Sequence, residues 1–290
     1  MAGKTFEGKV VVVTGAGAGI GREYALYFGR EGAKVVVNDL GADRHGGGKG
    51  GDAAGKVVEE IKAAGGEAVA NFDTVATREG ADGIIWTALA KYNHLDILIN
   101  NAGILRDRTL VNMSDFDWDL IMDVHLKGTY HCSQAAARIF KVQKSGGRII
   151  TTTSLAGLLG NFGQTNYSSA KAGIYGFTRT ASMELAKMGV TVNAIAPVAL
   201  TRLTEDIAML KGVSKEEMGP QFIVPAVAFL CSDLGADVTG QIIGVQSGRI
   251  FIYKMAQSDG VNKDPSKGAW TINEIKEKWD EICANPQPAF

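Results

Sequence analysis

The sequence contains few cysteines, and they form no pattern that would indicate a metal site or a disulfide framework. Cys132, Cys231 and Cys283 stand far apart in apolar or amphipathic surroundings, with no CxxC or cysteine–histidine spacing. We interpret them as buried free thiols and expect no metal ion. A reducing, intracellular compartment agrees with this interpretation.

Excess charge and long apolar runs are also absent. The formal net charge is -1, with lysine and arginine scattered along the chain, so no basic patch indicates binding to nucleic acid or to an anionic membrane. No charge-free apolar run reaches the roughly 18 residues needed to span a bilayer, and the segment MAGKTFEGKV does not resemble a signal peptide. The final residues PQPAF differ from an SKL-type peroxisomal signal. We therefore expect a cytoplasmic protein whose partners are small molecules and copies of itself.

The composition and the order of the segments favour an α/β enzyme. Hydrophobic residues make up 46% of the 290 residues, enough for a large core. Short β-branched runs alternate with segments of helical period, which predicts a parallel sheet covered by helices on both faces. We expect one Rossmann-type, doubly wound domain over residues 1–256, followed by a C-terminal extension over residues 257–290. The predicted strands are 9–14, 33–39, 67–73, 96–101, 147–154, 190–197 and 241–248, and the predicted helices include 53–64, 78–92, 114–144 and 166–188.

The C-terminal extension contains signals for one more helix. Thr271 and Glu274 have the spacing of a capping box, and Trp270 can staple onto Ile275. We expect a helix docked on the body of the protein or on a neighbouring subunit, with an apolar face made of Ile272, Ile275, Trp279 and Ile282.

A glycine-rich turn connects the first predicted strand to a helix. The segment TGAGAGIG at residues 14–21 follows four consecutive valines. Such a turn exposes backbone N–H groups and the positive end of a helix dipole to an anion, and a pyrophosphate is its natural guest. Asp39 ends the next strand about 20 residues later, where a carboxylate can accept hydrogen bonds from both hydroxyls of an adenosine ribose. Since a 2′-phosphate would meet like charge there, NAD is favoured over NADP. The alternative interpretation of Asp39 is that it caps a helix or is a surface charge after a strand.

Three polar residues after the fifth predicted strand suit the oxidation of an alcohol. Tyr167 and Lys171 are four residues apart on a predicted helix, so they share one face. An ammonium near a phenol favours the phenolate and lowers its pKa toward the range of a general base. Ser154 can hold the substrate oxygen against the tyrosine. Chance spacing is the alternative for any one of these residues, but together they lie at the carboxyl side of a sheet, where such folds bind ligands.

With these motifs, the sequence resembles the short-chain dehydrogenases/reductases over nearly its whole length. The matching motifs are TGAGAGIG, NNAG at residues 100–103, Ser154, and YSSAK at residues 167–171. The resemblance implies that Tyr167 is the catalytic base, that Lys171 tunes it and binds the nicotinamide ribose, and that Ser154 orients the substrate. It also implies a cofactor site made of Gly15, Gly19, Ile20, Gly21, Asp39, Leu40, Asp73, Thr74, Asn101, Ala102, Gly103, Tyr167, Lys171, Pro197, Ala199 and Thr201.

A narrower resemblance concerns one group within this family. The glycine-rich stretch at residues 41–55, which on its own indicates no chemistry, and GNFGQTNYSSAK resemble the (3R)-hydroxyacyl-CoA dehydrogenase domains of peroxisomal multifunctional enzymes type 2, also described as 17β-hydroxysteroid dehydrogenases type 4. The resemblance implies NAD-dependent oxidation of a (3R)-3-hydroxyacyl-CoA with a fatty or sterol chain in β-oxidation, by a stand-alone enzyme such as bacteria would make. Alternatives are a 17β-hydroxysteroid dehydrogenase, a 3-oxoacyl reductase and a non-catalytic dinucleotide-binding protein.

Two positions depart from the usual family pattern. His125 stands where many members have an asparagine that holds a water linking the lysine to solvent. His125 either takes over this relay, by holding the water or passing a proton itself, or is a helix histidine that only packs against its neighbours. Val198 follows Pro197 where many members have glycine. For the phosphates of an acyl-CoA, we consider Arg106, Arg108, Arg202, Lys211 and Lys215. The family further implies a mobile lid at residues 201–219 and a homodimer or homotetramer.

Overall fold

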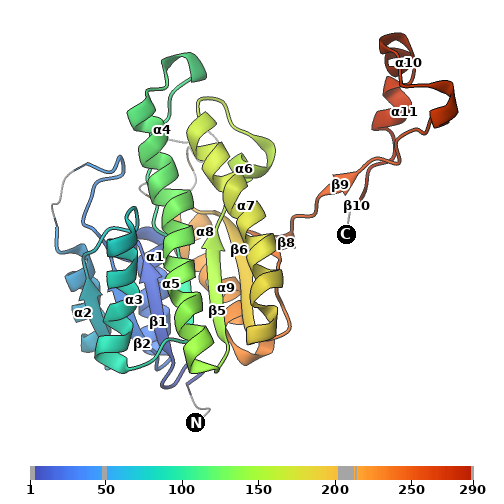
Figure 1. Ribbon diagram of the computed structural model, residues 1–290. Helices are drawn as coiled ribbons and strands as arrows, with labels where there is room; N and C mark the ends of the chain where they lie inside the picture. The colour runs from blue at the N-terminus through green and yellow to red at the C-terminus, as the bar shows by residue number, and fades with distance from the viewer. Residues whose placement is uncertain (1–3, 48–50, 202–211, 213, 289–290) are drawn as a thin grey trace. The chain divides into compact units, whose positions relative to one another are not determined.

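The computed structural model describes residues 4–47, 51–201, 212 and 214–288. Backbone contacts divide the chain into two units, residues 1–251 and residues 252–290, which we describe separately. The first unit contains an eight-stranded sheet with the order β3-β2-β1-β4-β5-β6-β7-β8 (Figure 1). The predicted α/β Rossmann-type fold is thus confirmed.

Seven parallel strands build most of the sheet, and each coincides with a predicted β-branched run. The register pairs Val12 with Val36 of the neighbouring strand and with Leu98 on the other side. Strand β8 follows β7 after two residues, a connection that allows only an antiparallel hairpin. The strands are β1 (Val10–Thr14), β2 (Lys34–Asn38), β3 (Glu67–Asn71), β4 (Ile97–Asn100), β5 (Gly147–Thr152), β6 (Val190–Val198), β7 (Ile242–Gln246) and β8 (Arg249–Ile252).

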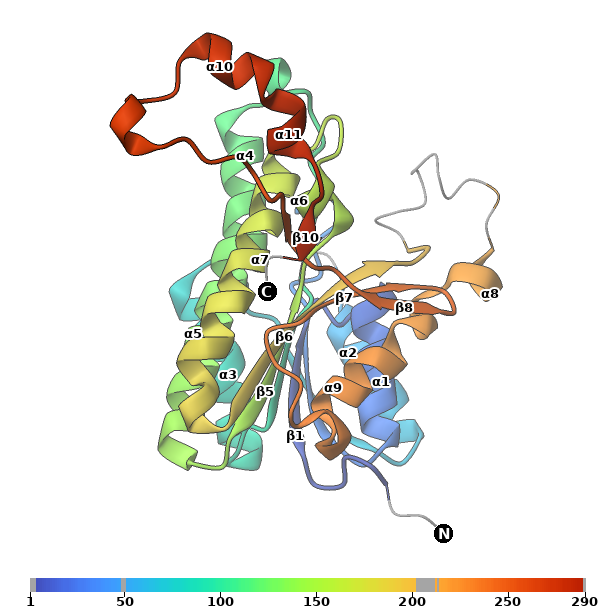
Figure 2. The same ribbon diagram turned by 90° about the vertical axis from the view of Figure 1, so that its right-hand side faces the viewer.

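Helices cover both faces of the sheet (Figure 2). The valines of β1 alternate between two cores: Val11 and Val13 pack with α1 (Gly19–Arg30), α2 (Ala53–Ala63) and α9 (Val224–Cys231). Val10 and Val12 pack on the opposite face with α3 (Arg78–Tyr92), α5 (Gly128–Gln143) and α7 (Thr165–Leu185). Two buried faces explain why these strands are apolar throughout instead of alternating.

The predicted helix 114–144 forms as one column with a wider turn inside it. Ser114 caps α4 (Asp115–Ile121) by accepting a hydrogen bond from the Asp117 N–H. The π-helical turn η2 (Met122–Lys127) follows and leads directly into α5. A π-helical turn holds one residue more than an α-helical one, and such turns are frequent at functional sites. Here the turn contains His125. Short helices α6 (Leu155–Leu159) and α8 (Lys215–Met218) complete this unit together with 3-10 turns such as η1 (Leu110–Asn112).

The C-terminal unit contains two short helices where one was predicted. The capping box of Thr271 and Glu274 is present at the start of α10 (Ile272–Glu277), but the helix ends at Lys278, and α11 (Trp279–Cys283) begins after it. Neither glycine nor proline marks this break in the sequence. A two-stranded ribbon of β9 (Ala256–Gln257) and β10 (Gln287–Pro288) closes the unit. Among all described residues, no helix has both the length and the apolarity to cross a membrane.

Candidate active site

The strand order reverses between β1 and β4, and the polar residues at this point hold the two strand ends together. The Thr14 hydroxyl accepts hydrogen bonds from the N–H groups of Asn101 (3.0 Å) and Ala102 (3.1 Å). The Asn101 side chain donates in return to the carbonyl oxygens of Thr14 (3.0 Å) and Gly15 (3.1 Å). In doubly wound sheets, ligands bind outside the strand ends at such a switch point.

The glycine turn after β1 leaves room for an anion at the start of α1. Gly15 and Gly19 have positive φ values of 64° and 55°, which other residues rarely adopt. No described side chain caps α1 at Ala18, so the first N–H groups of the helix are available to a pyrophosphate. Gly21 has a packing role instead, because a Cβ there would lie 2.2 Å from the Gly15 carbonyl oxygen. The turn therefore fits a dinucleotide.

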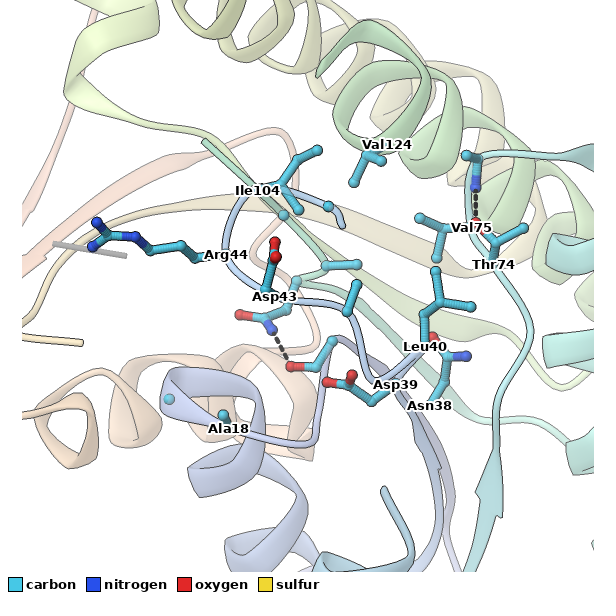
Figure 3. Close-up of a pocket in the computed structure, with 18 of the residues that line it drawn as sticks. Ala18, Asn38, Asp39, Leu40, Asp43, Arg44, Thr74, Val75, Ile104 and Val124 are labelled. Carbon is cyan, nitrogen blue, oxygen red and sulfur yellow. Dashed lines mark hydrogen bonds between the residues drawn. The ribbon is translucent and has the colours of Figure 1, made fainter. Parts of the chain in front are cut away.

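Asp39 lines a pocket beside this turn, between the labelled Ala18 and Asn38 (Figure 3). Its two carboxylate oxygens accept hydrogen bonds from the N–H groups of Gly17 and Gly41, both at 2.8 Å. These bonds fix the side chain in place before any ligand arrives. The carboxylate of Asp39 thus occupies the predicted position, at the end of the second strand and beside the glycine turn.

Most of the predicted cofactor residues line this pocket, and a few do not. Eleven line it: Gly15, Gly19, Ile20, Asp39, Leu40, Asp73, Thr74, Asn101, Ala102, Gly103 and Thr201. The other five, outside the lining, are Gly21, Tyr167, Lys171, Pro197 and Ala199. The pocket has further lining residues that no motif in the sequence indicated, among them Asn38, Asp43, Arg44, Gly46, Val75, Leu120 and Val124.

The glycine-rich stretch after Asp39 contributes a wall of the pocket, although its composition alone indicated no chemistry. We call residues 42–47 the insert loop. One carboxylate oxygen of Asp43 accepts hydrogen bonds from the N–H groups of His45 (2.8 Å) and Gly47 (3.0 Å). An aspartate followed within four residues by glycine is typical of such a turn, and this signal was available in the sequence. Figure 3 shows the loop rising from Leu40 past Asp43 toward Ile104.

Ser154, Tyr167 and Lys171 come together where β5 ends and α7 begins. Ser154 caps α6, accepting a hydrogen bond from the Ala156 N–H at 3.2 Å. The Lys171 ammonium lies 5.5 Å from the centre of the Tyr167 ring and donates a 2.6 Å hydrogen bond to the Thr152 carbonyl oxygen. This arrangement can hold a hydroxyl between Ser154 and Tyr167 with a cationic group behind the phenol.

The pKa values of this cluster follow burial more than the sequence predicted. Burial raises the pKa of Tyr167 to about 12, a hydrogen bond with Ser154 opposes the rise, and nearby Asp107 adds to it. Burial also lowers the pKa of Lys171 to about 7. The sequence predicts that Lys171 lowers the pKa of Tyr167, whereas in the structure removal of both side chains from water is the main cause of both pKa shifts.

His125 lies next to the catalytic tyrosine candidate. The two rings meet edge to face, with centres 5.2 Å apart. The Nε2 atom lies 2.8 Å from the carbonyl oxygen of Ile104, whereas buried Nδ1 has no hydrogen-bond partner among the described residues. Burial and the charge of Lys171 hold the pKa of His125 well below its usual value, so the ring is neutral. Both predicted roles, relay and packing, are compatible with this position.

Of the basic residues considered for CoA, Arg106 is engaged inside the protein. It forms a 2.8 Å ion pair with Asp117, and its guanidinium lies over the Phe116 ring. Arg202 and Lys211 lie outside the described residues, as do the Lys215 side chain and the predicted lid over positions 202–211 and 213. Arg108 is exposed and donates to the adjacent Asp107 carbonyl oxygen.

Comparisons with known proteins identify relatives of the whole chain. It is 46% identical to a putative short-chain type dehydrogenase/reductase of Mycobacterium tuberculosis, over 94% of this chain and 93% of the relative. It is also 46% identical to the peroxisomal multifunctional enzyme type 2 of Drosophila melanogaster, and there the match covers 96% of this chain but 45% of the longer relative. A 3-oxoacyl-[acyl-carrier-protein] reductase of Synechocystis is 42% identical over 84% of the chain.

The structural comparison agrees. The crystal structure of a short chain dehydrogenase from Mycobacterium avium superposes with a TM-score of 0.85 and 43% identity, covering 98% of this chain and 97% of the other. The family pattern described as short chain dehydrogenase matches residues 9–209. The predicted resemblance, including that to the multifunctional enzymes type 2, is confirmed. The chain belongs to the short-chain dehydrogenase/reductase family and is an oxidoreductase that uses a nicotinamide dinucleotide.

Proposed function

We propose that this enzyme oxidises a (3R)-3-hydroxyacyl-CoA, with a fatty or sterol chain, to the 3-oxoacyl-CoA, and that NAD accepts the hydride. The observation that carries the proposal is the cluster of Ser154, Tyr167 and the buried Lys171 beside a dinucleotide pocket that is lined by Asp39. Relatives named as multifunctional enzyme and as hydroxyacyl-CoA dehydrogenase support the thioester substrate.

In the proposed reaction, Ser154 holds the substrate hydroxyl and Tyr167 removes its proton. A bound nicotinamide would supply the hydride acceptor for the carbon that carries this hydroxyl. Lys171 supports this step because its ammonium form stabilises the phenolate beside it, 5.5 Å from the ring centre. His125, packed edge to face on Tyr167, is proposed to hold the water that connects this pair to solvent.

Asp39 supports NAD over NADP. A fixed carboxylate at the ribose position attracts two hydroxyls and repels a 2′-phosphate, since like charges meet there in a partly buried site. The biosynthetic 3-oxoacyl reductase reading requires NADPH and is disfavoured for this reason. Direct titration of the protein with NADH and with NADPH tests the preference.

The substrate is tested by following NADH formation. The substrates are a medium-chain (3R)-hydroxyacyl-CoA, its (3S) isomer, a sterol-side-chain (3R)-hydroxyacyl-CoA and a free 17β-hydroxysteroid. We expect turnover with the (3R)-acyl-CoAs alone. Preference for the free steroid would move the function to hydroxysteroid oxidation, and inactivity with all four substrates would favour a non-catalytic dinucleotide-binding protein.

The role of Tyr167 as the base is tested by a tyrosine-to-phenylalanine substitution, and a second tyrosine of the same helix serves as the matched control. Tyr167→Phe is expected to lower kcat at least about a thousandfold, within the range of general acid–base catalysis, because only the hydroxyl is removed. The Kd of NADH should stay within about twofold, since this hydroxyl lies outside the lining of the dinucleotide pocket. Tyr175→Phe, two turns further along α7, is expected to retain wild-type turnover. A Tyr167→Phe enzyme with substantial activity would remove Tyr167 from the base role.

We also propose a homodimer or homotetramer in the cytoplasm. Large apolar side chains are exposed on helices α4, α5 and α7, among them Phe116, Tyr130, Val142 and Met183. Such exposed groups are typical of surfaces that bind a second copy. Sedimentation equilibrium measures the assembly, and a monomer at micromolar concentration would contradict it.

A further inference from the structure

The segment 104–108, which follows the NNAG motif, contacts both the cofactor pocket and the catalytic helix. Its Leu105 N–H donates to the Arg44 carbonyl oxygen of the insert loop at 3.0 Å. Further along, the Arg108 N–H donates to the Gly163 carbonyl oxygen at 2.8 Å, just before α7. The segment thus lies between two parts of the site that are about 120 residues apart in the sequence.

Arg106, in the middle of this segment, binds the insert loop through its side chain. Its Nε donates a 2.8 Å hydrogen bond to the His45 carbonyl oxygen. Its Nη1 donates to the Asp117 carboxylate at 2.8 Å, and the guanidinium lies 4.8 Å from the centre of the Phe116 ring. Asp117 is fixed in turn by Ser114, whose hydroxyl donates to its other carboxylate oxygen at 2.9 Å. Arg106 therefore links the insert loop to the start of α4.

The backbone of Arg106 binds the start of the catalytic helix. The fully buried Asn166 donates from its side-chain amide to the carbonyl oxygens of Arg106 (3.0 Å) and Asp117 (3.1 Å). The side-chain oxygen of Asn166 accepts a hydrogen bond from the Tyr167 N–H at 2.8 Å. One continuous set of hydrogen bonds thus extends from the wall of the dinucleotide pocket to the backbone of Tyr167.

We propose that Arg106 is a positioning residue that holds the insert loop in its dinucleotide-binding form and ties it to the start of α7. This inference rests on the proposed function only through the identity of the catalytic helix. It replaces the alternative in which Arg106 binds a phosphate of CoA. Two of its donors already have acceptors inside the protein, and a planar guanidinium is suited to bridging two such acceptors.

The proposal predicts which binding and kinetic constants change when Arg106 is replaced and which do not. Arg106→Met should raise the Kd of NADH about tenfold in the absence of acyl-CoA, the equivalent of one charge-assisted hydrogen bond. The KM for acyl-CoA should not change, and kcat should fall by less than about threefold, since the backbone contact with Asn166 remains. A CoA-phosphate contact predicts the reverse: unchanged NADH binding and a raised KM for acyl-CoA.

A conservative variant and a matched control complete the experiment. Arg106→Lys keeps the charge but not the planar fork, so the weakened NADH binding should persist; a phosphate contact would be rescued by lysine. Arg78→Met is the control, because Arg78 also has an aspartate partner, a carbonyl acceptor on a histidine and an aromatic ring beneath it, on α3 and outside this network. It should bind NADH as the wild type does.

Direct binding separates the failure of this inference from that of the proposed function. NADH titration requires no substrate, and circular dichroism shows whether each variant is folded. If Arg106→Met does not fold, the milder Arg106→Lys variant is titrated in its place. Wild-type NADH affinity in both Arg106 variants would overturn the inference. A wild-type protein that binds NADH but oxidises no acyl-CoA would overturn the substrate proposal and leave the inference standing.

Discussion

Replacing Gly17 by alanine tests how Asp39 is held for the cofactor. A Cβ at this position would lie 2.7 Å from the Asp39 Oδ2 atom and 2.6 Å from the Ala53 Cβ. Ordinary contacts begin near about 3.5 Å, so the carboxylate must move by roughly 0.8 Å. The added methyl group would meet Ala53 as well as Asp39, so a small shift of one neighbour does not relieve both contacts.

The expected consequence is weaker and less selective dinucleotide binding. The displacement breaks the 2.8 Å hydrogen bond from the Gly17 N–H to the carboxylate. Hydrogen bonds to charged groups contribute about 1.5–3 kcal/mol, which corresponds to a rise in the Kd of NADH of about tenfold to a hundredfold. The preference for NADH over NADPH should shrink as well, because the negative charge leaves the ribose position.

Calorimetric titration with NADH and NADPH measures both effects. Gly248→Ala is the control, since among the described residues no atom lies within 4 Å of the Cβ it would add. It should bind NADH like the wild type. Unchanged NADH affinity in a folded Gly17→Ala protein would show that Asp39 does not need the hydrogen bond from the Gly17 N–H. It would contradict the claim that this fixed carboxylate sets the cofactor preference.

Two further predictions concern stability. The pKa of Lys171 is about 7 in the folded protein and 10.5 for an ordinary lysine, so between these pH values the unfolded chain binds more protons. The free energy of unfolding of the wild type relative to Lys171→Met should therefore rise between pH 7 and pH 10, with a slope approaching about 1.4 kcal/mol per pH unit. Urea unfolding across this range measures it, and a flat difference would mean that Lys171 is not desolvated. Gly103→Ala would place a Cβ 2.6 Å from the His125 ring, and overpacking of this kind should reduce the free energy of unfolding by about 1–3 kcal/mol. An unchanged thermal midpoint would show that the ring can move.

Local patterns in the sequence were sufficient to predict most of the fold. The valines of β1 are apolar throughout because both faces of the strand are buried, and this signal does not depend on distant residues. The spacing of Tyr167 and Lys171 likewise follows from helical geometry alone. The break at Lys278 has no comparable local signal.

Long-range packing determined what the sequence did not predict. The pKa values of Tyr167 and Lys171 follow their burial, which depends on segments far away in the chain. The contribution of Asp43 to the pocket depends on the insert loop meeting the segment after β4, about 60 residues away. Sequence alone also pointed Arg106 toward solvent and CoA, whereas its partners lie on two other segments.

The π-helical turn at Met122–Lys127 makes the site sensitive to chain length. A π-helical turn accommodates one additional residue without changing how the helices on either side of it are aligned, so removing one residue from this turn would restore a regular helix and leave α4 and α5 facing as before. Asp117 would keep its contact with Arg106, whereas His125 would lose the position against the Tyr167 ring that the wider turn gives it. A single deletion here would therefore disturb the neighbour of the catalytic tyrosine and leave the cofactor loop in place, although no residue that contacts substrate need be changed.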